Sequence, residues 1–572
     1  MKEDEQAWAN RRFADGVAEY LAEAGVRTVV ISPGSRSTPL VLGFASLGSF
    51  RLIPVLDERS AAFLALGLAR STERPVGLVC TSGSAVANWF PAVVEAHESR
   101  VPLLLMTADR PPELRGCGAG QTIDQERFYG RYTRAFREYP IPGDEDEGKV
   151  PWRDFLAADW AALSGDYPGP VHLNFPFREP LLPPESESFP SPKTFFGKKV
   201  SGSRYGRPFD APVLPSRWQE GGRTLLLSGS WLGPGGDDWT GWFRNLAGER
   251  GWPLLADALS PLRHQEEGSF RPVAHYDMLL RHEEIAKTLR PDRIIQLGSL
   301  PTSKVLRKCL EEWQTPRLII DPYSLNPHPD TAPVEWLARP DKTSNEIPLP
   351  PPGEDSGFRE NWVVQDKKAG EFIQAKTGES GSFEGALYPL LAEHLPEQTV
   401  LHIASSTPVR DAEWFWPVNG KRFRIYSSRG ANGIDGTLST AIGEAVGEAR
   451  PLWLVTGDLA LLHDANGILQ HQLEGLSLTI LLINNEGGGI FQNLPIARYG
   501  ETFERFFATP QQIDWGTWAK TFGVSHALVR DPAELAQLAA RPAPAGVRIL
   551  EWATDRRGDA EERRRWLTAF SP

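Results

Sequence analysis

The sequence predicts three doubly wound α/β domains in series, each built on a mainly parallel sheet. A short apolar run, a Gly/Ser/Asp turn and a helical stretch recur in that order along the 572 residues. The chain is also longer than a single hydrophobic core usually supports. Two proline-rich joints, at 181–217 and 347–357, interrupt the recurring pattern. We therefore expect domains at 1–190, 191–355 and 356–572.

The elements are expected in the following order. An amphipathic helix over 1–21 opens the first segment. Strands should then lie within RTVVISPGS, LIPVLDERS, PVGLVCTSGS and PLLLMTADR of the first segment, TLLLSGS, PLLADA, RIIQLGS and RLIIDP of the second, and TVLHIASS, RIYSSRG, LWLVTGD and LTILLINN of the third. Each of these runs ends in small or polar residues, which is typical of a buried parallel strand.

Composition and charge argue against several classes of protein. The chain is 41% hydrophobic and 23% charged, as ordinary globular proteins are. Its formal net charge of −12 argues against general binding to nucleic acid. No window approaches the roughly 18 to 20 apolar residues of a membrane span, and no signal peptide is evident, so we expect a cytoplasmic protein without membrane insertion. Cys80, Cys117 and Cys309 are too scattered for a disulfide framework, and Cys80 should be a core residue.

Polar residues follow two apolar runs of the third segment. Asp458 ends LWLVTGD, and Asn485 ends the next run 27 residues later, the length of one βαβ unit. If the two strands are neighbours, both residues reach the same sheet edge. Carboxylate, amide and main-chain oxygens are ligands that Mg²⁺ prefers, and glycine-loop amides suit phosphate. The sequence predicts a magnesium-diphosphate site with Asp458, Asn485 and the Gly487 carbonyl as ligands.

An alternative interpretation of these acids is purely structural. A single aspartate at a strand end more often caps a turn or a helix than binds a metal. Asp464 is expected to cap the helix over 465–476 in this way.

The third segment also carries a resemblance to a known family. A Gly-Asp turn followed by Asn-Asn resembles the diphosphate motif of thiamine-diphosphate enzymes. GDLALLHDANG and INNEGGGIF together are similar to the 2-succinyl-5-enolpyruvyl-6-hydroxy-3-cyclohexene-1-carboxylate (SEPHCHC) synthases of menaquinone biosynthesis. In most thiamine-diphosphate enzymes a glycine follows the aspartate, whereas this chain has Leu459. The resemblance implies thiamine diphosphate and Mg²⁺, or Mn²⁺, bound by Glu58, Ile434, Gly457, Asp458, Leu459, Asn485, Gly487, Gly488 and Ile490.

Two of these residues have distinct implied roles. Glu58 lies at a strand-to-helix junction, where its carboxyl group should be buried. The resemblance implies that it hydrogen-bonds the aminopyrimidine ring and so promotes loss of the C2 proton of the thiazolium. Without the resemblance, Glu58 would be interpreted as a helix-capping acid. Ile434 resembles the apolar residue that holds the two cofactor rings in a bent shape.

A basic loop near the N-terminus suits carboxylates. In ISPGSRSTPL, Ser35, Arg36 and helix N-terminal amides can form a carboxylate cradle, and the loop lacks the lysine of a Walker A motif. This loop and TADRPPEL resemble substrate-binding segments of the same synthases. Two positions depart from the family pattern, because Gly120 and Val305 stand where many members have Asn and Arg. The resemblance implies substrate binding by Ser35, Arg36, Arg110, Gln121, Lys304, Ser406, Arg410, Arg429 and Phe491.

The resemblance implies one reaction and one assembly. The reaction is decarboxylation of 2-oxoglutarate and 1,4-addition of the succinyl carbanion equivalent to isochorismate. Both substrates are dicarboxylates, so an acidic protein must gather guanidinium groups to bind them. Because the residues for the two ends of the cofactor lie on different domains, the active sites should form between two chains of a homodimer or homotetramer. The alternatives are another thiamine-diphosphate 2-oxo-acid decarboxylase or carboligase, similar to acetolactate synthase, and a non-catalytic nucleotide-binding or regulatory protein.

Overall fold

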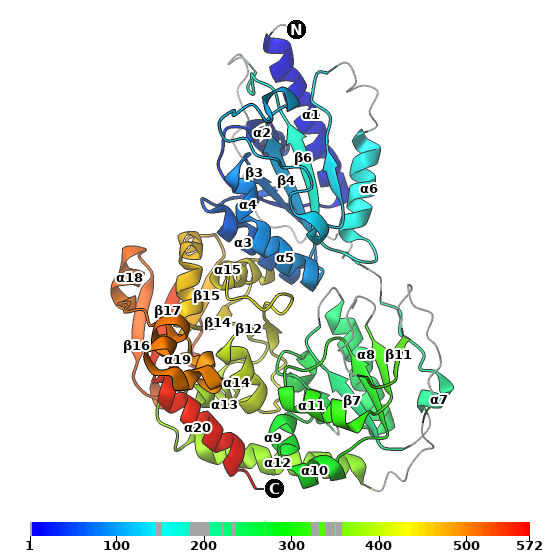
Figure 1. Cartoon of the computed structure of the whole chain (residues 1–572), viewed down its shortest axis with the longest axis vertical. Coiled ribbons are helices and arrows are strands. Elements are labelled where there is room, and N and C mark those ends of the chain that lie inside the picture. The colour runs from blue at the N-terminus through cyan, green and yellow to red at the C-terminus, as the bar shows by residue number, and fades with distance from the viewer. Residues whose placement is uncertain are drawn as a thin grey trace. The chain divides into compact units, whose positions relative to one another are not determined.

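The computed structural model describes residues 3–144, 152–183, 205–206, 209–219, 222–231, 235–268, 270–321, 331–337, 349 and 357–571. They form three sheets whose named strands are all paired in parallel, with helices packed around them (Figure 1), and this confirms the predicted fold class. The expected domain boundaries lie outside the described residues, as does most of both proline-rich joints. The chain forms two compact units, which comprise Met1–Arg207, Gly430–Ala449 and Asp464–Glu474, and Pro208–Arg429, Arg450–His463 and Gly475–Pro572.

The first unit contains a six-stranded sheet in the order β2-β1-β3-β4-β6-β5. Its strands are β1 (Thr28–Ile31), β2 (Arg51–Pro54), β3 (Val76–Cys80), β4 (Leu103–Asp109), β5 (Phe136–Glu138) and β6 (Val171–Pro176). The four expected runs form β1 to β4, whereas no sequence pattern had predicted β5 or β6. The run of β6, VHLNFP, includes His172 and Asn174, whose side chains are buried in the sheet although they are polar.

The helices of the first unit include two that come from the third sequence segment. They are α1 (Glu3–Ala24), α2 (Thr38–Leu47), α3 (Glu58–Thr72), α4 (Ser84–Asn88), α5 (Phe90–Ser99), α6 (Trp152–Ser164), α15 (Thr437–Glu448) and the 3₁₀ helices η1 (Pro112–Leu114), η2 (Gly130–Tyr132) and η6 (Ala465–Gln470). Cys80 is buried, as expected for a core residue.

Helices α3 and α15 cross at unusually close range. A Cβ atom added at Gly67 would lie 2.1 Å from the carbonyl oxygen of Thr440, and one added at Gly443 would lie 2.2 Å from that of Leu64. Both contacts are with backbone atoms, which cannot move aside as a flexible side chain can. The crossing therefore requires glycine at both positions.

The second unit contains the other two sheets. The central sheet has the order β11-β10-β9-β7-β8, and the third has the order β13-β12-β14-β15-β17-β16. The strands are β7 (Thr224–Ser228), β8 (Leu254–Ala256), β9 (Arg293–Leu297), β10 (Arg317–Ile320), β11 (Val334–Leu337), β12 (Val400–Ile403), β13 (Arg424–Tyr426), β14 (Leu452–Gly457), β15 (Ser477–Asn484), β16 (Ser525–Val529) and β17 (Gly546–Ala553). Of these, β11, β16 and β17 had not been predicted.

The helices of the second unit are α7 (Ser216–Gln219), α8 (Gly236–Arg250), α9 (Tyr276–Leu280), α10 (Glu283–Thr288), α11 (Lys304–Trp313), α12 (Phe358–Thr377), α13 (Leu387–His394), α14 (Thr407–Phe415), α16 (Asp458–His463), α17 (Gly500–Phe503), α18 (Trp515–Thr521), α19 (Pro532–Ala540) and α20 (Arg556–Ala569), with 3₁₀ helices η4 (Pro261–His264), η5 (Glu384–Ala386), η7 (Gly489–Asn493) and η8 (Pro495–Tyr499) and a π-helical turn η9 (Glu504–Ala508). One apolar core extends from the central sheet, at Leu225 and Ile294, to the third sheet, at Leu401 and Leu481.

None of the described helices is both long and apolar enough to cross a bilayer.

We expect Gly443→Ala to lower the melting temperature, because the new methyl group must push α3 and α15 apart. Overpacking of this kind costs about 1–3 kcal/mol. Differential scanning calorimetry would measure the change. Gly248→Ala in α8 is the matched control, since a Cβ there meets nothing within 4 Å, and it should keep or raise the melting temperature. Equal melting temperatures for wild type and Gly443→Ala would contradict the close crossing.

Candidate functional site

Asp458 and Asn485 lie at the carboxyl ends of neighbouring strands. Strands β14 and β15 pair in parallel with Gly457 opposite Ile483, as the predicted βαβ unit requires. Asp458 is 4% exposed, and its carboxylate accepts hydrogen bonds from the backbone N–H groups of Leu459 and Gly487, each at 2.8 Å. The bond to Gly487 ties the glycine loop after β15 to Asp458. Only the tertiary pairing of the strands brings these segments together.

The polar atoms of this pair have the character of metal ligands. Burial raises the pKa of Asp458 to about 6, against the effect of hydrogen bonds from Leu459 and Gly487. Asn485 is 6% exposed, and within the described residues its Oδ1 accepts no hydrogen bond. A buried amide oxygen without a donor is costly, and a bound cation would remove that cost. The donor set therefore fits a hard divalent cation.

The glycine loop is held by its own backbone. Gly487 has φ +137°, and a Cβ there would lie 2.4 Å from the Ala508 carbonyl oxygen. The Gly488 N–H donates to that carbonyl at 2.7 Å, and the Gly489 N–H donates to the Gly487 carbonyl at 2.8 Å. These N–H groups are thus already hydrogen-bonded in this conformation, although the sequence had suggested that they approach a phosphate. The Gly487 carbonyl keeps one lone pair for a ligand.

Residues that flank the loop and the aspartate are half-buried. Gly457 and Leu459 adjoin Asp458 at the end of β14. Ile490 and Phe491 lie on η7, and the Phe491 ring contacts that of Phe507 edge-on at 5.9 Å between centroids. The described residues contain no cluster of three or more His, Cys, Asp and Glu suited to a metal.

Asp464 does not cap the helix that follows it. The structure places a helix at Asp458–His463, before Asp464, and only the 3₁₀ helix η6 after it. The Asp464 carboxylate is fully buried and accepts hydrogen bonds from the N–H and the Oγ of Ser439, at 2.6 and 3.0 Å. It thus caps the first turn of α15 instead. Which helix Asp464 caps depends on which helix packs beside it.

Glu58 begins α3 but does not cap it. The capping residue is Asp57, whose side chain accepts from the N–H groups of Arg59 and Ser60. Glu58 is half-buried rather than buried, because the buried stripe of α3 begins only at Ser60. Within the described residues its carboxylate has no hydrogen bond or ion pair. It lies near Cys80, and its charge adds to the effect of burial in raising the pKa of that thiol.

Ile434 lies in the loop before α15. It is half-buried, and its carbonyl accepts from the Thr437 hydroxyl at 2.7 Å. The start of this loop is held by the buried carboxylate of Glu95 on α5, which accepts from the N–H groups of Gly430 and Ala431 at 2.9 and 2.6 Å. Nothing in the sequence around Glu95 indicates this role.

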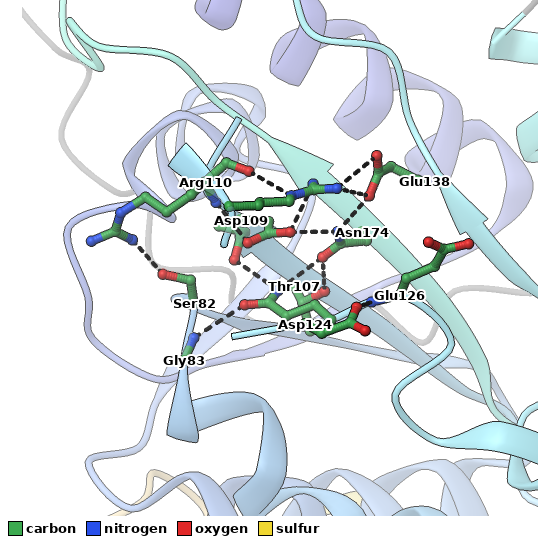
Figure 2. Close-up of polar contacts among 12 residues, drawn as sticks. Ser82, Gly83, Thr107, Asp109, Arg110, Asp124, Glu126, Glu138 and Asn174 are labelled. Atoms are coloured by element: carbon green, nitrogen blue, oxygen red, sulfur yellow. Dashed lines mark hydrogen bonds and ion pairs between the residues drawn. The ribbon is translucent and has the colours of Figure 1, made fainter. Parts of the chain in front are cut away.

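Arg110 and Gln121 meet at Ser82, and Figure 2 shows the Arg110 side chain reaching the Ser82 hydroxyl. The Ser82 hydroxyl in turn donates to the Gln121 carbonyl at 3.0 Å, and the Gln121 amide donates to the Ser82 carbonyl at 3.1 Å. Arg36 is 5% exposed, and burial followed by the charge of Arg110 lowers its pKa. Ser35 beside it is exposed. The two arginines are therefore close enough to repel each other.

A buried polar network lies behind Arg110 (Figure 2). Asn174 of β6 donates to Asp109 at 2.9 Å and accepts from Gln125 at 2.9 Å. Gln125 in turn accepts from the Gly83 N–H at 3.1 Å. The network fixes the end of β4, directly before Arg110, against the turn after β3. It could not be inferred from the sequence because β6 was not predicted.

A mostly apolar cavity of about 660 Å³ adjoins the loop that carries Ser35 and Arg36. It opens at the carboxyl ends of β1 and β2, and its wall includes Ile31, Pro33, Gly34, Val41, Leu56 and Leu469. Ligand pockets are commonly found at this edge of a parallel sheet.

A second pair of arginines lies in the second unit. Arg410 on α14 donates to the Ser406 carbonyl at 2.5 Å, and burial followed by the charge of Arg429 lowers the pKa of Arg410. Ser406 has φ +77°, a strained value for a residue with a side chain. Lys304 is exposed at the start of α11 and has no hydrogen bond or ion pair to any described residue. The structure thus brings together Ser406, Arg410 and Arg429.

Comparison with known proteins places this geometry in a family. Residues 11–128 match the thiamine pyrophosphate enzyme N-terminal TPP binding domain, and residues 411–546 match the C-terminal TPP binding domain. The chain is 43% identical to the 2-succinyl-5-enolpyruvyl-6-hydroxy-3-cyclohexene-1-carboxylate synthase of Synechococcus sp. (strain JA-3-3Ab), over 99% of this chain and 97% of that one. It is 41% identical to the synthase of that name from a Nostoc species, over 98% of each chain, and 42% identical to that of Microcystis aeruginosa, over 96% of each. This chain belongs to the family of 2-succinyl-5-enolpyruvyl-6-hydroxy-3-cyclohexene-1-carboxylate synthases.

Proposed function

We propose that this chain is a SEPHCHC synthase of menaquinone biosynthesis, acting in the cytoplasm. It decarboxylates 2-oxoglutarate and adds the resulting succinyl unit to isochorismate, with thiamine diphosphate and Mg²⁺ or Mn²⁺. The observation that carries the proposal is the buried, unpaired Oδ1 of Asn485 near Asp458. It lies in a chain that aligns over nearly its whole length with relatives named as this synthase.

The second unit would hold the metal and the diphosphate. Asp458, Asn485 and the Gly487 carbonyl are the proposed protein ligands of the cation. Further contacts to the cofactor come from Gly457, Leu459, Gly488 and Ile490. When bound, thiamine diphosphate supplies an electron sink that stabilises the carbanion left by loss of CO₂.

Glu58 and Ile434 would act at the other end of the cofactor. The half-buried Glu58 carboxyl group has no partner within the described residues, so it is left to hydrogen-bond a ring nitrogen of the cofactor. Ile434, carried by the loop that Glu95 holds, would support the rings from one side. Glu58 would act by its hydrogen bond to the ring, and Ile434 only by orienting the rings.

The two arginine pairs would bind the dicarboxylate substrates. Arg36 repels Arg110, and Arg410 repels Arg429, so a carboxylate between the members of either pair relieves that repulsion. Ser35, Gln121, Lys304, Ser406 and Phe491 are the proposed further contacts to substrate.

We expect isochorismate to be consumed only when 2-oxoglutarate, thiamine diphosphate and Mg²⁺ are all present. Omission of each component in turn, followed by chromatography of the product, tests this. Continued release of CO₂ without loss of isochorismate would indicate another thiamine-diphosphate 2-oxo-acid decarboxylase or carboligase. No turnover by the folded protein would favour a non-catalytic nucleotide-binding or regulatory role.

We also propose that the active sites form between two chains of a homodimer or homotetramer. Glu58→Gln should abolish activity while cofactor binding persists, because the carboxyl group at the ring is lost but the metal ligands remain. Asp458→Ala should abolish activity through loss of the cation. Co-expression of the two variants should restore about a quarter of wild-type activity, because half of the randomly formed dimers have one intact site.

Glu58→Gln and Asp458→Ala combined in one chain provide the control for this complementation. Dimers of the doubly substituted chain contain no intact site and should stay inactive. If co-expression of the single variants restores nothing although mixed dimers form, the sites do not combine residues of two chains.

Cation binding should weaken in acid. Protons compete with the cation for Asp458, whose pKa burial raises to about 6, so affinity should fall about tenfold per pH unit below that value and stay constant from pH 7 to 8. Electron paramagnetic resonance of Mn²⁺ from pH 5 to 8 measures this without cofactor, whose phosphates would titrate too. Asp458→Ala is the control and should bind no Mn²⁺ here at any pH. An affinity for Mn²⁺ that does not change with pH would show that Asp458 is not a ligand of the cation.

A further inference from the structure

Glu384 contacts the proposed metal ligand Asn485 from the side opposite its unpaired oxygen. Glu384 begins η5 and is 2% exposed. Its Oε2 accepts a hydrogen bond from the Asn485 Nδ2 at 3.3 Å, while the Asn485 Oδ1 is buried and accepts none from the described residues. The nitrogen of this amide therefore has a partner, and its oxygen is left for a ligand.

This contact selects one of two amide orientations. An asparagine amide can rotate by 180° and exchange its oxygen and nitrogen with almost no change in shape. An ionised carboxylate only accepts hydrogen bonds, so the nitrogen of Asn485 must face Glu384. Gly489 makes the fit closer, because a Cβ there would lie 2.8 Å from that nitrogen.

Glu384 is itself fixed by a buried ion-pair network. Arg563, which is 2% exposed, bonds both Glu384 and Asp411, the latter at 2.6 and 2.7 Å. The Glu384 N–H donates to Asp559 at 3.2 Å. Arg563 and Asp559 come from α20, far along the chain. The carboxylate thus has little freedom to turn away from Asn485.

We propose that Glu384 is a positioning residue of the metal site, which holds the Asn485 amide so that its oxygen faces the divalent cation. This inference rests on the proposed function, because the cation is part of it. Glu384 does not touch the cation in this proposal. It acts only through Asn485.

Glu384→Gln tests the proposal. A glutamine offers both an N–H and an oxygen, so either orientation of Asn485 finds a partner and the selection is lost. We expect cation affinity to fall about 10- to 100-fold, as loss of such supporting contacts usually causes. Mn²⁺ binding by electron paramagnetic resonance and Mg²⁺-dependent thiamine diphosphate binding by calorimetry measure it at pH 8.

Asp411→Asn is the matched control. Asp411 is equally buried and bonds the same Arg563, but it is not hydrogen-bonded to Asn485. Both substitutions weaken the ion-pair network, so both should lower the melting temperature, while Asp411→Asn should leave cation affinity unchanged. An equal loss of affinity in the two variants would mean that Glu384 is merely structural, and would overturn the proposal.

A double variant separates orientation from stability. Asn485→Asp presents a carboxylate oxygen whichever way the group turns, so it should restore cation affinity in the Glu384→Gln background. If Glu384→Gln does not fold, Gly489→Ala replaces it, because the new methyl group displaces the same amide nitrogen and should also weaken cation binding. Failure of the wild type to bind the cation would overturn the metal site itself. Normal binding by wild type and by both of these single variants would overturn only the role of Glu384.

Discussion

The parallel pairing of β14 with β15 is the constraint on which the rest of the proposed metal site depends. It places Asp458 and Asn485 at one sheet edge, and the hydrogen bond from Gly487 to Asp458 then closes the glycine loop over them. A slip of one residue in this pairing would turn every side chain of a strand to the opposite face. The strands are buried on both faces, which holds the register firmly.

Electrostatic mismatch distinguishes the candidate site from the surrounding fold. Around Asp458, oxygen atoms are buried, and the charge of Arg556 lowers the pKa of this carboxyl group less than burial raises it. Arg36 is buried and Arg410 is half-buried, each near another arginine, although Arg36 also pairs with the Glu179 carboxylate at 2.8 Å. Perturbed groups of this kind often mark functional sites. The end of β14 therefore suits a cation, and the arginine pairs suit carboxylates.

Buried acids far along the chain hold the candidate site residues in place. Glu384 lies 101 residues before the amide that it contacts, and Glu95 lies 335 residues before Gly430. Asp464 caps α15, a helix that it does not adjoin in the sequence. Asn174, on the neighbouring strand β6, supports the end of β4 before Arg110. Each of these side chains makes at least one hydrogen bond with a backbone N–H group or a side-chain amide. Such contacts fix orientation, which a metal or carboxylate site requires more than it requires proximity.

The sequence by itself determined the elements whose pattern is local. A strand lies in each of the twelve apolar runs, and Asp458 and Asn485 follow their strands as predicted, because burial on both faces and the turn residues that end a strand are written in adjacent positions. Strand β6 was missed because His172 and Asn174 interrupt its apolar run.

Only the tertiary structure decided the partners of the buried polar groups. The sequence did not indicate that Asp464 binds Ser439, that Asp57 rather than Glu58 caps α3, or that Glu384 holds Asn485. The physical reason is that a buried polar side chain must be hydrogen-bonded, but any donor or acceptor within reach satisfies it. Which one is within reach depends on how distant segments pack, and no local pattern carries that information.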